Sequence, residues 1–207
     1  AKTKVQVGVV VIDPKTGDIK ALIGGRNKQD YYGLNHITQI FRQPGSCFKP
    51  IIYTAAIENG LYPAYPILNQ RFDYNEWSPQ NYNKETGGFM TLRDGLRKSK
   101  NIIAARLVIE GHVELWQIGK LARRLGIKSK LDLYPAITLG ATQVTPLEMV
   151  SVFSTLANKG IYIEPTSIKQ VEDKDGIIIA NFTPKSREAI SAGTDYIITN
   201  MLQSVVN

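Results

Sequence analysis

The first part of the chain has apolar runs separated by a polar segment, a pattern that predicts a β-hairpin. Residues 5–12 and 19–23 are apolar and rich in β-branched side chains, and residues 13–18 between them are polar and contain Pro and Gly. Two such runs on either side of a turn sequence are typical of antiparallel strands. Gly24-Gly25 ends the second strand, and a polar, aromatic loop is expected to follow as far as about Gly33.

The middle of the chain carries helical patterns. Pro44-Gly45 precedes the first predicted helix and Asn59-Gly60 ends it. Thr145-Pro146 opens the last helix of this block, because proline is favoured in a first helical turn. Helices are expected at residues 46–58, 91–97, 101–110, 114–125 and 145–158. Residues 61–90 have little periodicity and predict a long irregular loop, a kind of segment that is usually functional within a compact domain.

The last part of the chain predicts a second hairpin and a final helix. The strands are expected at residues 166–172 and 177–182, and the helix at 193–206. The order of hairpin, helical block, hairpin and helix favours an α+β fold over an alternating βαβ fold. We expect one domain over residues 1–207. Within it, 1–45 holds the first strands and a lead-in, 46–160 the helical block, and 161–207 the second hairpin and the last helix.

The composition is that of an ordinary globular domain. The chain has 207 residues, of which 43% are hydrophobic and 21% are charged, and this excludes a disordered chain. Its single cysteine excludes an internal disulfide and a multi-thiolate zinc site, and its two histidines are not in ligand-like spacing. The sequence has no Gly-rich dinucleotide or phosphate loop. No metal or organic cofactor is expected.

The net charge of +7 raises the question of an anionic partner. The basic residues are scattered, and their densest group falls on one amphipathic helix and the loop after it, which is typical of a solvated helix face. This group comprises Lys120, Arg123, Arg124, Lys128 and Lys130. We therefore expect no nucleic-acid partner, although an anionic membrane surface or cell-wall polymer would also suit the charge.

Ser46 is the one serine followed by a lysine three residues later, Lys49. At the start of a helix the two side chains share one face, where a neutral lysine amine can take the proton of the serine hydroxyl and make it a nucleophile. This requires a lysine pKa lowered from about 10.4 towards 7–8. Taken alone, the pattern also fits a helix start with a surface lysine. Cys47 is expected to be a buried packing residue that points away from the Lys49 face.

A second polar motif, Ser99-Lys100-Asn101, falls between two predicted helices. There a polar side chain can project into a cleft, but Ser and Asn at a helix start also serve as simple capping residues.

Residues 42–50, Arg-Gln-Pro-Gly-Ser-Cys-Phe-Lys-Pro, resemble the active-serine segment of penicillin-binding proteins, the D,D-transpeptidases that cross-link peptidoglycan. Other segments resemble the class A, bifunctional branch in the same order: the hairpin at 9–25, the lead-in at 34–39, the loop beside the cleft at 77–81 and the helix start at 139–148. The resemblance covers essentially the whole chain. It implies the transpeptidase fold shared by penicillin-binding proteins and β-lactamases, with a central antiparallel sheet that is incomplete in this chain.

The resemblance also implies roles for the matched residues. Ser46 would be the acylated nucleophile and Lys49 its general base. Ser99 would relay a proton to the leaving D-alanine, and Asn101 would bind both Lys49 and the substrate amide carbonyl. In the loop beside the cleft, the implied substrate-binding residues are Trp77, Gln80 and Asn81.

The partners implied are peptidoglycan stem peptides and β-lactam antibiotics. The resemblance further implies an extracytoplasmic location, with a membrane anchor and a glycosyltransferase domain in the full-length protein.

The third motif of the family, Lys-Thr-Gly on a strand lining the cleft, is missing from the expected place. Lys15-Thr16-Gly17 spells it, but lies before Ser46 on a predicted turn, and no such triplet occurs between Asn101 and Asn207. We expect a complementary segment or chain to supply this motif and the remaining strands. Since the motif's strand would provide an oxyanion donor, worth about 10²–10³ in rate, this chain alone is expected to be weak or inactive.

Three alternatives share this fold. One is a β-lactam sensor domain, which is acylated only in order to signal, and another is a catalytically inactive interaction module. A serine β-lactamase is less favoured, because the sequence offers no evident carboxylate for deacylation.

Overall fold

The computed structural model describes residues 5–26 and 33–206. It begins with the expected hairpin, β1 (Val9–Ile12) and β2 (Ile19–Ile23), in which Val9 pairs with Ile23. β1 is shorter than the predicted strand over 5–12. The chain leaves the hairpin after β2, where the Gly24 carbonyl accepts a hydrogen bond from the His36 backbone N–H at 2.8 Å, and so residues 5–8 have no strand opposite them. Part of the loop predicted to reach Gly33 lies outside the described residues.

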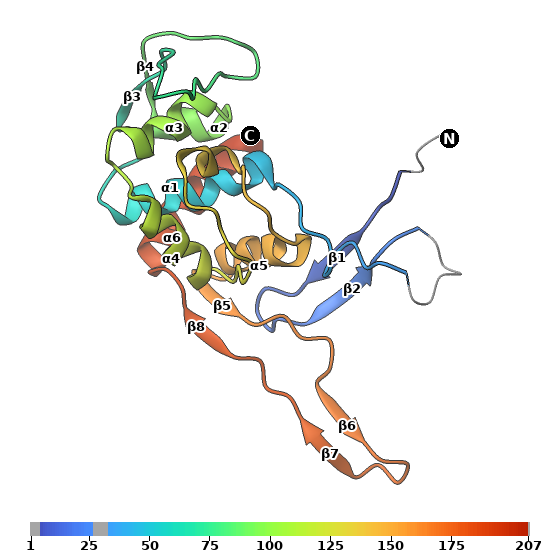
Figure 1. The fold of residues 1–207 in the computed structure, drawn as a ribbon. Coiled ribbons are helices and arrows are strands. Elements are labelled where there is room, and N and C mark those ends of the chain that lie inside the picture. Colours follow the sequence, from blue (N-terminus) through green and yellow to red (C-terminus); the bar gives the residue numbers. More distant parts are fainter. Residues whose placement is uncertain (1–4, 27–32, 207) are drawn as a thin grey trace.

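Six α-helices and two 3₁₀ turns are described, and the helices lie close to their predicted positions. They are η1 (Gly45–Phe48), α1 (Lys49–Glu58), α2 (Leu92–Arg97), α3 (Asn101–Ile109), α4 (Leu115–Arg124), η2 (Pro135–Leu139), α5 (Pro146–Ala157) and α6 (Ala192–Val206). Sequence reasoning missed η2 and merged η1 with α1. α1 is buried from Lys49 to Ile57 and contacts α3, α4 and α6 (Figure 1). Its composition explains this position, because a helix that is apolar on all sides is stable only in a core.

The segment 61–90, predicted to be irregular throughout, contains two short strands that pair with each other near its two ends. β3 (Pro66–Leu68) pairs antiparallel with β4 (Phe89–Thr91), and the 20 residues between them form the loop 69–88. Strands of three residues are too short to produce a recognisable alternation, which is why the sequence did not reveal them. The pairing fixes both ends of the loop beside α3.

The C-terminal hairpin forms the outer half of a longer arm (Figure 1). β6 (Gln170–Glu172) pairs with β7 (Ile178–Asn181), and each is shorter than predicted because the register shifts after Val171. Nearer the body of the molecule, β5 (Ile161–Ile163) pairs with β8 (Ser186–Glu188), a pair that sequence reasoning missed.

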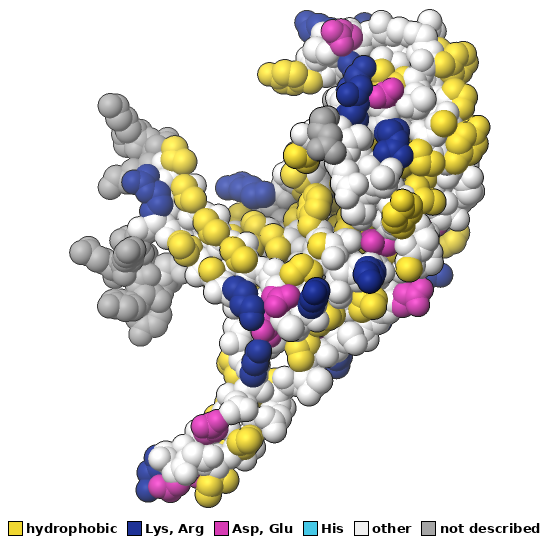
Figure 2. All heavy atoms as spheres, turned by 180° about the vertical axis from the view of Figure 1, so that it is seen from behind, with side chains coloured by type: hydrophobic (Ala, Val, Ile, Leu, Met, Phe, Trp, Pro, Cys, Tyr) yellow, Lys and Arg dark blue, Asp and Glu magenta, His cyan; other side chains and the backbone are white. Residues whose placement is uncertain are grey.

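Each sheet in the described part of the chain has only two strands. As a consequence, apolar side chains of the first hairpin remain exposed, among them Val9, Val11, Leu22 and Ile23. Figure 2 shows such side chains gathered along this part of the surface. A two-stranded ribbon with open edges is marginal by itself. The expected incomplete central sheet is therefore confirmed.

Candidate active site

Ser46 lies in the 3₁₀ turn η1, directly before α1. A 3₁₀ turn has three residues per turn, so residues three apart lie in line, and this aligns Ser46 with Lys49. Ser46 is exposed, whereas Lys49 is 1% exposed. The turn is held tightly from outside: a Cβ atom added at Gly140, the residue after η2, would lie 2.1 Å from the carbonyl oxygen of Gly45. The backbone before Ser46 is thus fixed by direct contact between two glycines.

Lys49 joins the two polar motifs of the sequence. Its Nζ donates hydrogen bonds to the Ser99 carbonyl at 2.7 Å, to Ser99 Oγ at 3.0 Å and to Asn101 Oδ1 at 2.7 Å. An ammonium group has three N–H donors, and all three are used. Burial lowers the pKa of Lys49 to about 8, as the serine-activation chemistry requires.

Ser99 is held in an unusual backbone conformation between α2 and α3. Its φ of 49° is in the left-handed region, which a non-glycine residue adopts at a cost in energy. This bend separates the two helices and lets both the carbonyl and the hydroxyl of Ser99 reach Lys49. The predicted helix break is confirmed.

The loop 69–88 contacts this cluster through its backbone. The Gln80 carbonyl accepts a hydrogen bond from Asn101 Nδ2 at 2.8 Å. The next residue, Asn81, is buried, and its side chain makes three hydrogen bonds within the protein. Trp77 is half-buried and lines an apolar pocket of about 370 Å³ with Tyr134 and Pro135. Of the three predicted loop residues, Gln80 and Asn81 therefore contact the start of α3 beside Lys49, and Trp77 lines the apolar pocket.

Cys47 is exposed, so the prediction of a buried packing residue is wrong. The reason is the 3₁₀ geometry of η1, in which Phe48 takes the buried position and Cys47 faces solvent.

Two features of the site, one in the backbone and one in a side chain, could not be predicted from the sequence. One is the Gln80 carbonyl, because every residue carries such a group. The other is Lys100, which is buried inside the Ser-x-Asn motif and pairs with Glu85 of the loop at 3.1 Å. A lysine in a helix-start motif gave no indication of burial.

The rest of the described chain offers no competing centre. Lys15-Thr16-Gly17 lies in the turn of the first hairpin, as predicted. Among residues 5–26 and 33–206, no group of three or more His, Cys, Asp or Glu side chains could hold a metal ion. No helix in this part is long and apolar enough to span a membrane.

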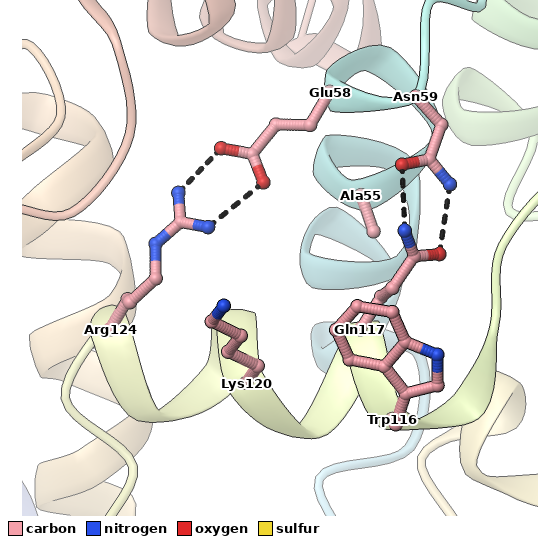
Figure 3. A pocket seen from close by; sticks show the side chains of 7 residues that line it. All are labelled: Ala55, Glu58, Asn59, Trp116, Gln117, Lys120 and Arg124. Atoms are coloured by element: carbon pink, nitrogen blue, oxygen red, sulfur yellow. Dashed lines mark hydrogen bonds and ion pairs between the residues drawn. The ribbon is translucent and has the colours of Figure 1, made fainter.

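In a pocket of about 130 Å³ between α1 and α4, four of the polar side chains that line it form two pairs, and Lys120 belongs to neither pair (Figure 3). Arg124 binds Glu58, and Asn59 exchanges hydrogen bonds with Gln117. Arg124, one member of the basic group, is thus engaged within the protein.

Comparison with known proteins identifies the family. A family model described as the penicillin binding protein transpeptidase domain matches residues 7–207. The chain belongs to this family. It is 32% identical over 204 residues to penicillin-binding protein 1A of Aquifex aeolicus, covering 96% of this chain and 28% of that protein. The chain thus spans less than a third of that relative's length.

Solved structures agree with this family membership. The crystal structure of penicillin-binding protein 1A from Haemophilus influenzae matches with a TM-score of 0.88 and 27% identity, over 97% of this chain and 35% of that one. Penicillin-binding protein A from M. tuberculosis, solved as an imipenem acyl-enzyme complex, matches with a TM-score of 0.83 and 20% identity, over 96% of this chain and 57% of that one. The second match concerns the fold alone.

Proposed function

We propose that this chain is the catalytic-serine part of a D,D-transpeptidase domain that cross-links peptidoglycan through an acyl-Ser46 intermediate. The observation that carries the proposal is the buried Lys49, which is bonded to Ser99 and Asn101 and lies one 3₁₀ turn from an exposed serine. This arrangement combines a nucleophile, a base with a lowered pKa and groups that orient the base.

In the first half-reaction, neutral Lys49 takes the proton of Ser46 Oγ as that oxygen attacks the carbonyl carbon between the two D-alanines. The new C–O bond gives a tetrahedral oxyanion. As it collapses, the C–N bond breaks, and the proton passes from Lys49 through Ser99 Oγ to the amine of the leaving D-alanine. In the second half-reaction, an amine of a neighbouring stem peptide attacks the acyl-Ser46 ester. Its proton returns by the same route to Ser46, which is released as the free hydroxyl.

A β-lactam would enter the same sequence as a substrate mimic. Attack by Ser46 would open the lactam ring and leave an ester whose leaving amine stays tethered. Penicillin-binding protein A from M. tuberculosis, which has the same fold, is known as an acyl-enzyme complex with the β-lactam imipenem.

The remainder of the domain would come from a complementary segment or chain. Residues 1–207 would form one partial domain. Further strands would pair with the first hairpin and cover its apolar side chains, which are exposed in this chain. The added strands would supply Lys-Thr-Gly and a second oxyanion donor. In the full-length protein we also propose a glycosyltransferase domain and a membrane anchor that holds the enzyme outside the cytoplasm, because the class A relatives suggest them.

The alternative functions of the same fold are less well supported. An inactive interaction module would have no need of a buried Lys49 that makes three hydrogen bonds. For a β-lactam sensor or a β-lactamase, no observation gives specific support.

Intact-mass spectrometry after incubation with a penicillin tests the proposal. The 207-residue chain and the complete domain are compared, each as wild type and as Ser46→Ala. A stable adduct that maps to Ser46 in the complete domain and is absent from Ser46→Ala is expected. An adduct of equal yield on the short chain would show that the missing strands are dispensable for acylation. Failure of the complete wild-type domain to form any adduct would refute the acyl-serine function.

A further inference from the structure

One buried side chain, Asn81, joins the loop 69–88 to the start of α3. Asn81 is 3% exposed. Its Nδ2 donates to Asn69 Oδ1 at 2.9 Å and to the Glu85 carbonyl at 2.6 Å, and its Oδ1 accepts from the Ile102 backbone N–H at 3.2 Å. A single amide therefore connects the first residue of the loop, Asn69, with Glu85 in its second half and with the first turn of α3.

The bond to Ile102 replaces a cap that α3 lacks. The first N–H groups of a helix have no partner within the helix and usually bond to a side chain at the N-cap position. In α3 that position is Lys100, whose side chain makes no capping bond and reaches Glu85 instead. Asn81 supplies an acceptor from the loop. Since Asn101 is the first residue of α3, the group that fixes this turn also fixes Asn101.

The residue next to Asn81 sets the direction of the Asn101 amide. The Gln80 carbonyl can only accept, so it selects the NH₂ end of Asn101 and turns Oδ1 towards Lys49. With the amide reversed, two acceptors would face each other at Gln80 and two donors at Lys49. Any group that holds the backbone of residues 80–81 against α3 therefore controls the contact between Asn101 and Lys49.

We propose that Asn81 is a positioning residue for acylation, which keeps the Asn101 amide oxygen on Lys49 by holding the backbone of residues 80–81 against α3. The inference rests on the proposed acyl-Ser46 function. It gives Asn81 a role different from the substrate contact that the sequence predicted. Both N–H groups of its buried amide are already used within the protein, which leaves no donor for a substrate.

The test measures the second-order rate of acylation of the full-length protein by a fluorescent penicillin, as a function of pH. It compares wild type, Asn81→Ala, Asn101→Ala and the double variant. Asn81→Ala is expected to slow acylation about ten- to a hundredfold, as other losses of supporting contacts do. Because Asn101 Oδ1 stabilises charged Lys49, both single variants should move the rising limb of the profile to lower pH. The double variant should be no slower than Asn101→Ala alone.

Asn59→Ala is the matched control. Asn59 also takes part in three amide hydrogen bonds, with His112 and Gln117. It lines the pocket between α1 and α4 (Figure 3), at the opposite end of α1 from Ser46. Loss of the Asn59 amide should leave the pH dependence of the acylation rate unchanged. Should Asn81→Ala fail to fold, Asn69→Ser removes only one acceptor of the Asn81 amide and should produce a smaller shift in the same direction.

Two results would overturn the inference while leaving the proposed function intact. One is a wild-type profile in a folded Asn81→Ala or Asn69→Ser variant. The other is a double variant whose rate loss equals the product of the two single losses. A wild-type protein that is not acylated at all would overturn the proposed function, and the inference with it.

Discussion

Asn101 and Lys49 are joined by a hydrogen bond of 2.7 Å between Asn101 Oδ1 and Lys49 Nζ. Two opposing influences act on the lysine. Burial disfavours its charged form and lowers its pKa to about 8, whereas an acceptor beside the ammonium group favours that form. Because all three ammonium hydrogens are engaged by Ser99 and Asn101, the amine must lose a proton before it can accept one from Ser46.

Acylation by a penicillin should accelerate as the pH rises, with its midpoint near pH 8, because half of Lys49 is neutral when the pH equals its pKa of about 8. Lys49→Arg keeps the charge but cannot act as a base, and should slow acylation by about 10²–10⁴-fold at every pH. Stopped-flow fluorescence with a labelled penicillin measures both effects. A rising limb near pH 5, or near-normal rates in Lys49→Arg, would exclude Lys49 as the base.

Gly140→Ala should destabilise the domain by about 2–5 kcal/mol, combining left-handed backbone strain with the overlap against Gly45. The Gly140 φ is 72°, and the new methyl group would lie 2.1 Å from the Gly45 carbonyl oxygen. Gly111→Ala provides the comparison, since its φ is 75° but no atom lies within 4 Å, so only the strain of about 1–2 kcal/mol applies. Urea unfolding gives both values. Equal losses would mean that the glycine contact has no cost of its own.

Asp195→Asn should stabilise the chain at neutral pH. Asp195 is 6% exposed, its Oδ1 has no hydrogen-bond partner, and burial raises its pKa from 3.8 to about 6. Because the folded state holds its proton more tightly, stability should fall as the pH rises from about 4 to 6 and stay lower above that. The variant should gain about 1–2 kcal/mol at pH 7 and little at pH 4. Urea unfolding at pH 4 and at pH 7 tests this prediction, with the exposed Asp132→Asn as the control. An Asp195→Asn variant whose stability at pH 7 is unchanged or lower would contradict the prediction.

Cys47→Ser should be acylated at the wild-type rate, because the exposed thiol takes no part in the Lys49 cluster. In the folded wild-type protein, a maleimide should label Cys47 readily. A bulky maleimide should also hinder acylation of the adjacent Ser46. Mass spectrometry follows both modifications, and a penicillin adduct on residue 47 would instead favour a thiol nucleophile.

The sequence was most informative where a structural signal is local. α2 and α5 begin where predicted to within one residue, because Thr91 and Thr145 cap their own helices. The Ser-x-x-Lys spacing indicated that Lys49 follows Ser46 by one turn, and the motif at 99–101 indicated a helix break, because each depends on a few neighbouring residues. The contact between Lys49 and Asn101, which are 52 positions apart, was implied only by the family resemblance.

Features that depend on distant segments could not be predicted in the same way. β5 and β8 are three residues each and pair across more than twenty residues, so neither carries an alternation of its own. Cys47 was misassigned because a single 3₁₀ turn changes which residue faces the core. The Gln80 carbonyl is invisible in a sequence, since it orients Asn101 through a group that all residues share.

The contact between Gly45 and Gly140 has a consequence for selection by β-lactams. A target can escape an inhibitor by reshaping the backbone around its nucleophile, but here that backbone rests directly on a second backbone segment. A side chain added at Gly140 would overlap this segment, and the φ of 56° at Gly45 disfavours any side chain there. A substitution at either glycine would therefore destabilise the enzyme whether or not an inhibitor is bound. Variants with reduced penicillin sensitivity should therefore accumulate at the exposed positions of the loop 69–88 rather than in η1 or η2. The variants recovered from a randomised library under penicillin selection would show that distribution.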